Sequence, residues 1–142
     1  MIYFIYYWLP LLAWMLFIFP TNDSLTADST FSIIVPVLKW FLPDASQPAL
    51  ETIHGLIRKF SHFLGYGFLA YLLFRAFRGK SRIFRHKWIL YAGLISVGYG
   101  LLDEFFQTLI TSRTGSFYDW MIDVAGAISV LVIIYHKNKA KG

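Results

Sequence analysis

The chain has 142 residues, of which 57% are hydrophobic and only 15% are charged, and its mean hydropathy is +0.55. A soluble domain of this length cannot bury so much apolar surface, so the composition indicates a single integral membrane domain over residues 1–142. The sequence contains no cysteine, which excludes disulfides and a cysteine nucleophile. The net charge of +5 comes mainly from loops and the C-terminal tail.

The first predicted transmembrane span covers residues 2–19, an uncharged apolar run that Pro20 closes. Its 18 residues are enough to cross a hydrocarbon core of ~30 Å. We predict a retained helix rather than a signal peptide, because no basic residue precedes the run and no small-x-small cleavage site ends it.

A segment of different character follows at residues 21–50. Its apolar part, residues 31–42, is only 12 residues long and is broken by Pro36. It is too short to span a bilayer, so we expect it to lie in the interface or to re-enter the membrane partway. The two prolines in residues 43–48 predict extended backbone there.

The second predicted span, residues 56–77, carries a polar stripe. Lys59, His62 and Tyr66 are spaced i, i+3 and i+7, which places them along one side of a helix. Gly67 is one of several small residues that would let neighbouring membrane helices approach closely.

Charge predicts the topology of the remaining chain. The loop at residues 78–87 contains five basic residues and no acid, and it separates the second span from a third at 88–110 and a fourth at 117–135. By the positive-inside rule, this loop and both termini are cytoplasmic, and the segments 21–55 and 111–116 face outward. The basic charges are therefore a topology signal, and no nucleic-acid partner is expected.

This topology places the polar residues of the last three spans at one depth, in the outer half of the membrane. Asp103 and Gln107 are i, i+4 near the end of the third span, and Asp119 and Asp123 are i, i+4 at the start of the fourth. Glu104 lies about 100° round the helix from Asp103, at a helix interface or toward the headgroups. Ionisable groups at membrane depth are costly unless paired, so we predict a functional cleft there.

The polar positions of residues 56–130 form one extended motif: Lys59-x2-His62-x3-Tyr66, then Asp103-Glu104-x2-Gln107-x5-Arg113-x5-Asp119-x3-Asp123-x2-Gly126. This motif resembles that of the VanZ-like family of small bacterial integral membrane proteins. The resemblance implies action at the outer face of the cytoplasmic membrane and lowered susceptibility to teicoplanin-type glycopeptide antibiotics. Two positions depart from the family pattern: Thr111-Ser112 stands where Pro-Gly is usual, and Gly65 stands where many members carry an acid.

Three interpretations of the predicted cleft are open. Two facing carboxylates, Asp103 with Asp119 or Asp123, would share one proton and so provide an acid and a base. The same groove would also suit binding without turnover, and its near-neutral charge balance would equally suit a network that only joins helices. The candidate catalytic residues are Asp103, Glu104, Asp119, Asp123 and His62, and the candidate substrate-binding residues are Lys59, Tyr66, Gln107 and Arg113.

The expected partners are membrane lipids, with a lipid-linked peptidoglycan precursor or a glycopeptide antibiotic as candidate ligand. No cofactor is expected, and no metal site either, because the sequence has no HExxH or paired-histidine spacing and basic residues lie near the acids. His54 is expected to be solvated. The sequence does not determine the oligomeric state.

Overall fold

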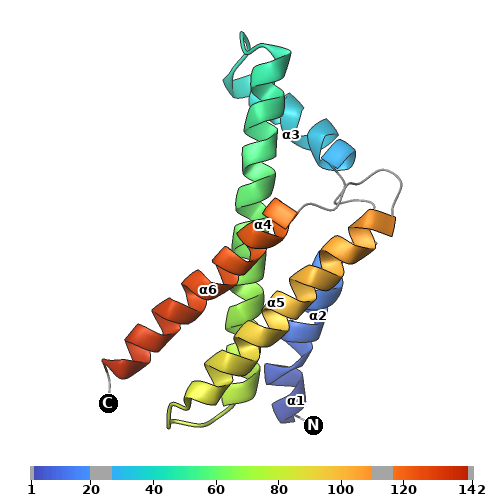
Figure 1. Cartoon of the computed structure of the whole chain (residues 1–142). Coiled ribbons are helices and arrows are strands. Elements are labelled where there is room, and N and C mark those ends of the chain that lie inside the picture. Colours follow the sequence, from blue (N-terminus) through green and yellow to red (C-terminus); the bar gives the residue numbers. More distant parts are fainter. Residues whose placement is uncertain (1, 20–26, 110–116, 141–142) are drawn as a thin grey trace.

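The computed structural model describes residues 2–19, 27–109 and 117–140. This part of the chain is all-helical, as predicted, and contains no strand (Figure 1). In chain order, its helices are α1 (Ile2–Tyr7), α2 (Leu9–Ile18), α3 (Ala27–Phe41), α4 (Gln47–Arg78), α5 (His86–Leu109) and α6 (Phe117–Lys139).

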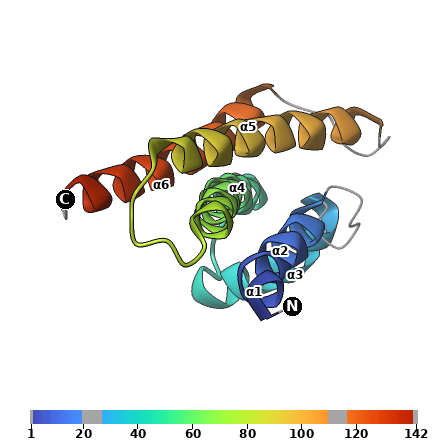
Figure 2. The same ribbon diagram turned by 90° about the horizontal axis from the view of Figure 1, so that it is seen from below.

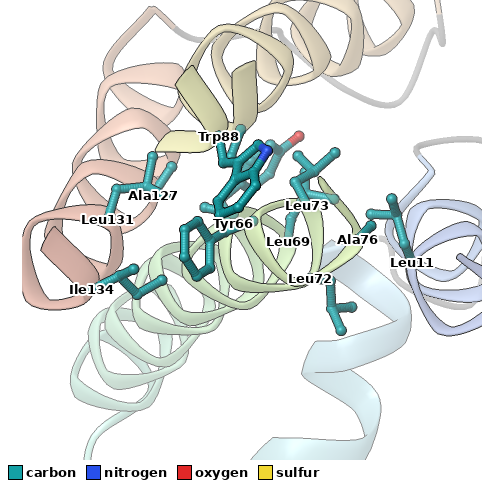
Figure 3. Close-up of a cluster of buried hydrophobic side chains, with 13 residues drawn as sticks. Leu11, Tyr66, Leu69, Leu72, Leu73, Ala76, Trp88, Ala127, Leu131 and Ile134 are labelled. Atoms are coloured by element: carbon teal, nitrogen blue, oxygen red, sulfur yellow. The ribbon is translucent and has the colours of Figure 1, made fainter. Parts of the chain in front are cut away.

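Helix α4 is the central element of the fold. Seen from below, it lies between α5 and α6 on one side and α1, α2 and α3 on the other (Figure 2). The core follows this arrangement: Leu69 and Leu73 of α4 are buried together with Leu11 of α2, Trp88 of α5 and Ala127 of α6 (Figure 3). Each of the other described helices thus contacts α4.

The segment predicted as a single first span is divided in two. Helix α1 ends at Tyr7 and α2 begins at Leu9, with Pro10 in the first turn of α2. Proline has no N–H to donate to the preceding turn and favours the start of a helix, which explains the division. Two backbone hydrogen bonds through Trp8 still join the helices, from its N–H to Phe4 and from Leu12 to its carbonyl.

Two expectations for the next segments need correction. Pro36 lies inside α3 and does not end it, and this helix begins earlier than the predicted apolar segment at residues 31–42. Pro48 lies in the first turn of α4, so the backbone is helical from Gln47 and not extended throughout residues 43–48. Proline is tolerated in a first turn because the missing N–H would have no intrahelical partner.

Glycines allow α4 and α6 to touch through their backbones. A Cβ atom built on Gly67 would lie 3.0 Å from Cγ2 of Val130 and 3.2 Å from the carbonyl oxygen of Gly126. A Cβ atom on Gly126 would overlap the carbonyl group of Phe63. The small residues predicted to let helices approach therefore serve that purpose at this crossing.

Two of the described helices are long and apolar enough to cross a membrane, His86–Thr108 and Phe117–Lys139. They correspond to the predicted third and fourth spans. The four-span bundle is not confirmed, because α1 and α2 have only 6 and 10 residues. Helix α4 is long enough, but residues such as Arg58, Lys59 and His62 make it more polar.

Replacement of Gly126 by alanine should destabilise the protein. The added methyl group would meet a backbone carbonyl, which cannot rotate away, and overpacking of this kind costs about 1–3 kcal/mol. The measurement is the thermal unfolding midpoint of purified protein in detergent, which should fall for Gly126→Ala.

Gly98→Ala is the matched control, because Gly98 is also a helical glycine and a Cβ atom placed on it would meet no neighbouring atom within 4 Å. Its midpoint should stay the same or rise, since alanine favours a helix by about 1 kcal/mol over glycine. Equal midpoints for the two variants would contradict the close α4–α6 crossing.

Candidate functional site

A contact between α4 and α6 forms the first part of the site. His62 Nδ1 lies 3.2 Å from Asp123 Oδ1 and is hydrogen-bonded to it. The Asp123 side chain is 0% exposed, whereas that of His62 is 33% exposed. The contact exists because the glycine crossing at Gly126 brings the first turns of α6 against the middle of α4.

A second contact joins α4 to α5. The hydroxyl group of Tyr66 donates to Asp103 Oδ2 at 3.2 Å, and the side-chain amide of Gln107 donates to the same oxygen at 3.1 Å. All three side chains are buried. The i, i+4 spacing of Asp103 and Gln107 therefore produces the neighbouring side chains that the sequence predicted.

The two contacts belong to one cluster. One ligand-type atom each from His62, Asp103 and Asp123 lies within 4.8 Å of the other two. Of the two acids considered as the partner of Asp103, Asp123 is the one in this cluster. We call His62, Tyr66, Asp103, Gln107 and Asp123 the polar centre.

Two neighbouring acids lie at different positions. Glu104 is buried, so of its two expected places, the interior of the helix packing is the one that the structure shows. Asp119 is half-buried and lies one helical turn before Asp123. It contributes to a separate pocket with Lys59 and does not join the polar centre.

A cavity of about 520 Å³ opens beside the polar centre. Aromatic and aliphatic side chains of α2, α3 and α4 form most of its wall, among them Trp14, Phe17 and Ile34. Its polar lining includes Arg58 and all of the polar centre except Asp123. We call it the apolar cavity.

A smaller pocket of about 130 Å³ shares part of its lining with the apolar cavity. Lys59 and Asp119 line it together with His54, and Arg58 and His62 line both this pocket and the apolar cavity. We call it the basic pocket. Basic side chains are therefore common to the walls of the two hollows.

The sequence-based interpretation missed His54. We expected this residue to be solvated, but it is buried on α4, where its Nε2 is hydrogen-bonded to Thr30 Oγ1 at 3.1 Å and the ring of Phe31 covers it. The i, i+4, i+8 spacing of His54, Arg58 and His62 was an available signal. It was overlooked because the predicted helix began after His54.

Trp14 was also missed as part of the site. Its indole N–H donates to the carbonyl oxygen of Gly65 at 3.0 Å, and its ring packs edge-on against Phe68. This contact holds α2 against α4 and places the Trp14 ring in the wall of the apolar cavity. Arg113, which was predicted to bind substrate, lies outside the described residues.

The fold and the site define a small all-helical protein with a buried carboxylate–imidazole centre between its helices. Residues 4–138 match the VanZ/LLP1 family, which is nearly the whole chain. The chain therefore belongs to the VanZ/LLP1 family, and the resemblance found in its sequence motif is confirmed. A search of curated proteins and a search of solved structures each found no match.

Removal of the Tyr66 hydroxyl group should destabilise the protein. Tyr66→Phe deletes a hydrogen-bond donor to Asp103 Oδ2, and we expect a loss of about 1–2 kcal/mol in the free energy of unfolding. Tyr71→Phe is the matched control on the same helix, because the Tyr71 side chain is exposed. Its effect should stay within about 0.5 kcal/mol. Similar losses in the two variants would contradict a stabilising bond to Asp103.

Proposed function

We propose that this VanZ/LLP1 protein is a multi-pass protein of the bacterial cytoplasmic membrane that binds a lipid-linked envelope precursor at the outer face. Binding or modification of that precursor would lower susceptibility to teicoplanin-type glycopeptide antibiotics. The observation that carries this proposal is the apolar cavity, whose lining includes Arg58 and all of the polar centre except Asp123. An apolar hollow with a charged end suits a ligand that has a lipid tail and an anionic head.

The outer surface of the helices supports residence in a membrane. Large apolar side chains on α5 and α6 are exposed, such as Leu94 at 63%, Phe105 at 58% and Ile133 at 53%. Extended apolar surfaces of this kind are unfavourable in water and match a hydrocarbon environment. Two helices that meet the length and composition of a span fit the same interpretation.

The distribution of charge supports an outward-facing site. Both termini and the connection between α4 and α5 lie at the same end of the molecule (Figure 1). This connection includes most of the basic loop at residues 78–87, so the positive-inside rule assigns this end to the cytoplasm.

The length of α4 then sets the depth of the site. Its 32 residues extend for about 48 Å, more than a hydrocarbon core of ~30 Å. If the core begins near Arg75, about 20 residues bring it to an outer boundary near residue 56. His62 then lies in the outer half, Tyr66 lies close to the midplane, and Arg58 and Lys59 lie close to the outer boundary.

The size and lining of the cavity support a lipid-like ligand. A volume of about 520 Å³ falls within the range of roughly 300–1,000 Å³ that is typical of ligand sites. Arg58 at its polar end can hold a phosphate through a bidentate pair of hydrogen bonds. Lys59 in the basic pocket adds a second cation nearby, and the motif assigns Arg113 to the same role.

Modification of the ligand is the second candidate activity, and the polar centre favours it. Asp103 and Asp123 lie in one buried cluster with His62, an arrangement in which one group donates a proton while another accepts it. The alternative is that the His62–Asp123 pair only holds α4 against α6. A folded Asp103→Asn variant distinguishes these roles: loss of antibiotic protection with ligand affinity kept would indicate chemistry.

Obstruction of the apolar cavity should abolish lipid binding. Gly65 lines this cavity, and no atom lies within 4 Å of a Cβ atom placed on it. Gly65→Leu should therefore place a bulky side chain in the cavity and weaken binding of a polyprenyl-phosphate probe at least tenfold, measured by native mass spectrometry. Cells that express this variant should lose their added tolerance to teicoplanin.

Gly98→Leu is the matched control, because Gly98 has open space around it but does not line the cavity. It should keep the affinity of the unaltered protein. Arg58→Gln should weaken binding at least tenfold through loss of a charged contact, while Arg82→Gln in the basic loop should not. Unchanged affinity in both Gly65→Leu and Arg58→Gln would refute the proposal.

Single cysteines can test the orientation, since the natural sequence has none. A cysteine at Ser46, before α4, should react in intact cells with a thiol reagent that does not cross membranes. A cysteine at Arg82 should react only after the membrane is opened. The reverse pattern would place the polar centre in the cytoplasmic half.

A further inference from the structure

We propose that the polar centre binds a divalent transition-metal cation, with His62, Asp103 and Asp123 as ligands. The three side chains come from three helices, α4, α5 and α6, and one ligand-type atom of each lies within 4.8 Å of the other two. One imidazole nitrogen with two carboxylates is a donor set that suits Zn²⁺ or Mn²⁺.

The separations are close to those of a coordinated ion. Ligand atoms at about 2.0–2.2 Å from a metal lie about 3–4.4 Å from one another, depending on the geometry. His62 and Asp123 already meet this condition, with 3.2 Å between Nδ1 and Oδ1. Rotation of the side chains would bring all three groups into range of one ion.

A buried oxygen without a partner points to the same conclusion. The Asp123 side chain is 0% exposed. Its Oδ2 atom has no hydrogen-bond partner among the described residues. A carboxylate oxygen in such a position is costly unless a donor or a cation satisfies it. A metal ion in the cluster would satisfy it.

The two carboxylates of the cluster are held in place for a cation. Asp103 and Asp123 bring two acidic side chains into one buried cluster with His62. Tyr66 and Gln107 each donate a hydrogen bond to Asp103 Oδ2 and so orient this carboxylate. Hard oxygen donors of this kind suit a divalent cation.

Access to the site is available through His62. This side chain is partly exposed and lines both the apolar cavity and the basic pocket. On binding, the cation would take the place of the hydrogen between His62 Nδ1 and Asp123 Oδ1, and the imidazole would stay neutral with its one proton on Nε2. This proposal departs from the sequence-based expectation of no metal site, which rested on the lack of an HExxH or paired-histidine spacing and on the basic residues near the acids.

The experiment is a metal titration of the whole chain in detergent, purified without a histidine tag and first stripped with a chelator. Equilibrium dialysis against Zn²⁺ or Mn²⁺ alone, followed by elemental analysis, should give one ion per chain at micromolar concentrations. Binding should also raise the thermal unfolding midpoint, because the ion binds only the folded cluster.

Two variants test the proposed ligands, and a third serves as a control. Asp123→Asn and His62→Gln should each weaken binding at least tenfold, and His62→Gln changes the more exposed ligand should Asp123→Asn fail to fold. His136→Gln is the matched control, since His136 is exposed near the end of α6, far along the chain from the cluster. It should bind the ion as the unaltered protein does.

Two outcomes would overturn the proposal. One is a folded, unaltered protein that takes up less than about a tenth of an equivalent of either metal. The other is a folded His62→Gln variant that binds as tightly as the unaltered protein, which would assign the ion to another position. Because no lipid is present, neither outcome bears on the proposed precursor binding.

Discussion

The close crossing of α4 and α6 is the constraint on which the rest of the structure depends. The backbones touch where Gly67 faces Gly126 and where Gly126 meets the carbonyl group of Phe63. His62 and Asp123 flank this crossing, so their hydrogen bond at 3.2 Å is a consequence of the glycine contact. Side chains larger than hydrogen would separate the helices and would pull the imidazole away from the carboxylate.

The polar centre links three helices, and this explains why its stability and its function are difficult to separate. Asp103 accepts hydrogen bonds from a residue of α4 and from a residue of its own helix, and Asp123 pairs with α4 from the other side. In a low-dielectric interior, each of these groups needs its partners to remain buried. The same groups lie beside a cavity, which a network with a purely structural role does not require.

His62 lines two hollows. One is the apolar cavity, with Trp14 held in its wall by a hydrogen bond to Gly65. The other is the basic pocket with Lys59 and Asp119. Arg58 contributes to both, so an amphiphilic ligand would meet a cation where its tail ends and its head begins. This polarity along α4 is the structural basis of the proposed function.

The sequence by itself determined the helical class and the family, and helical spacing alone put Asp103 beside Gln107 and His62 beside Tyr66. Only the tertiary structure decided that Asp123 rather than Asp119 joins Asp103, and that His54 is buried under α3. It also decided that the first apolar run is divided at Trp8. Spacing along one helix fixes which side chains share a face, whereas contacts between helices depend on crossing angles and small residues that no local pattern specifies.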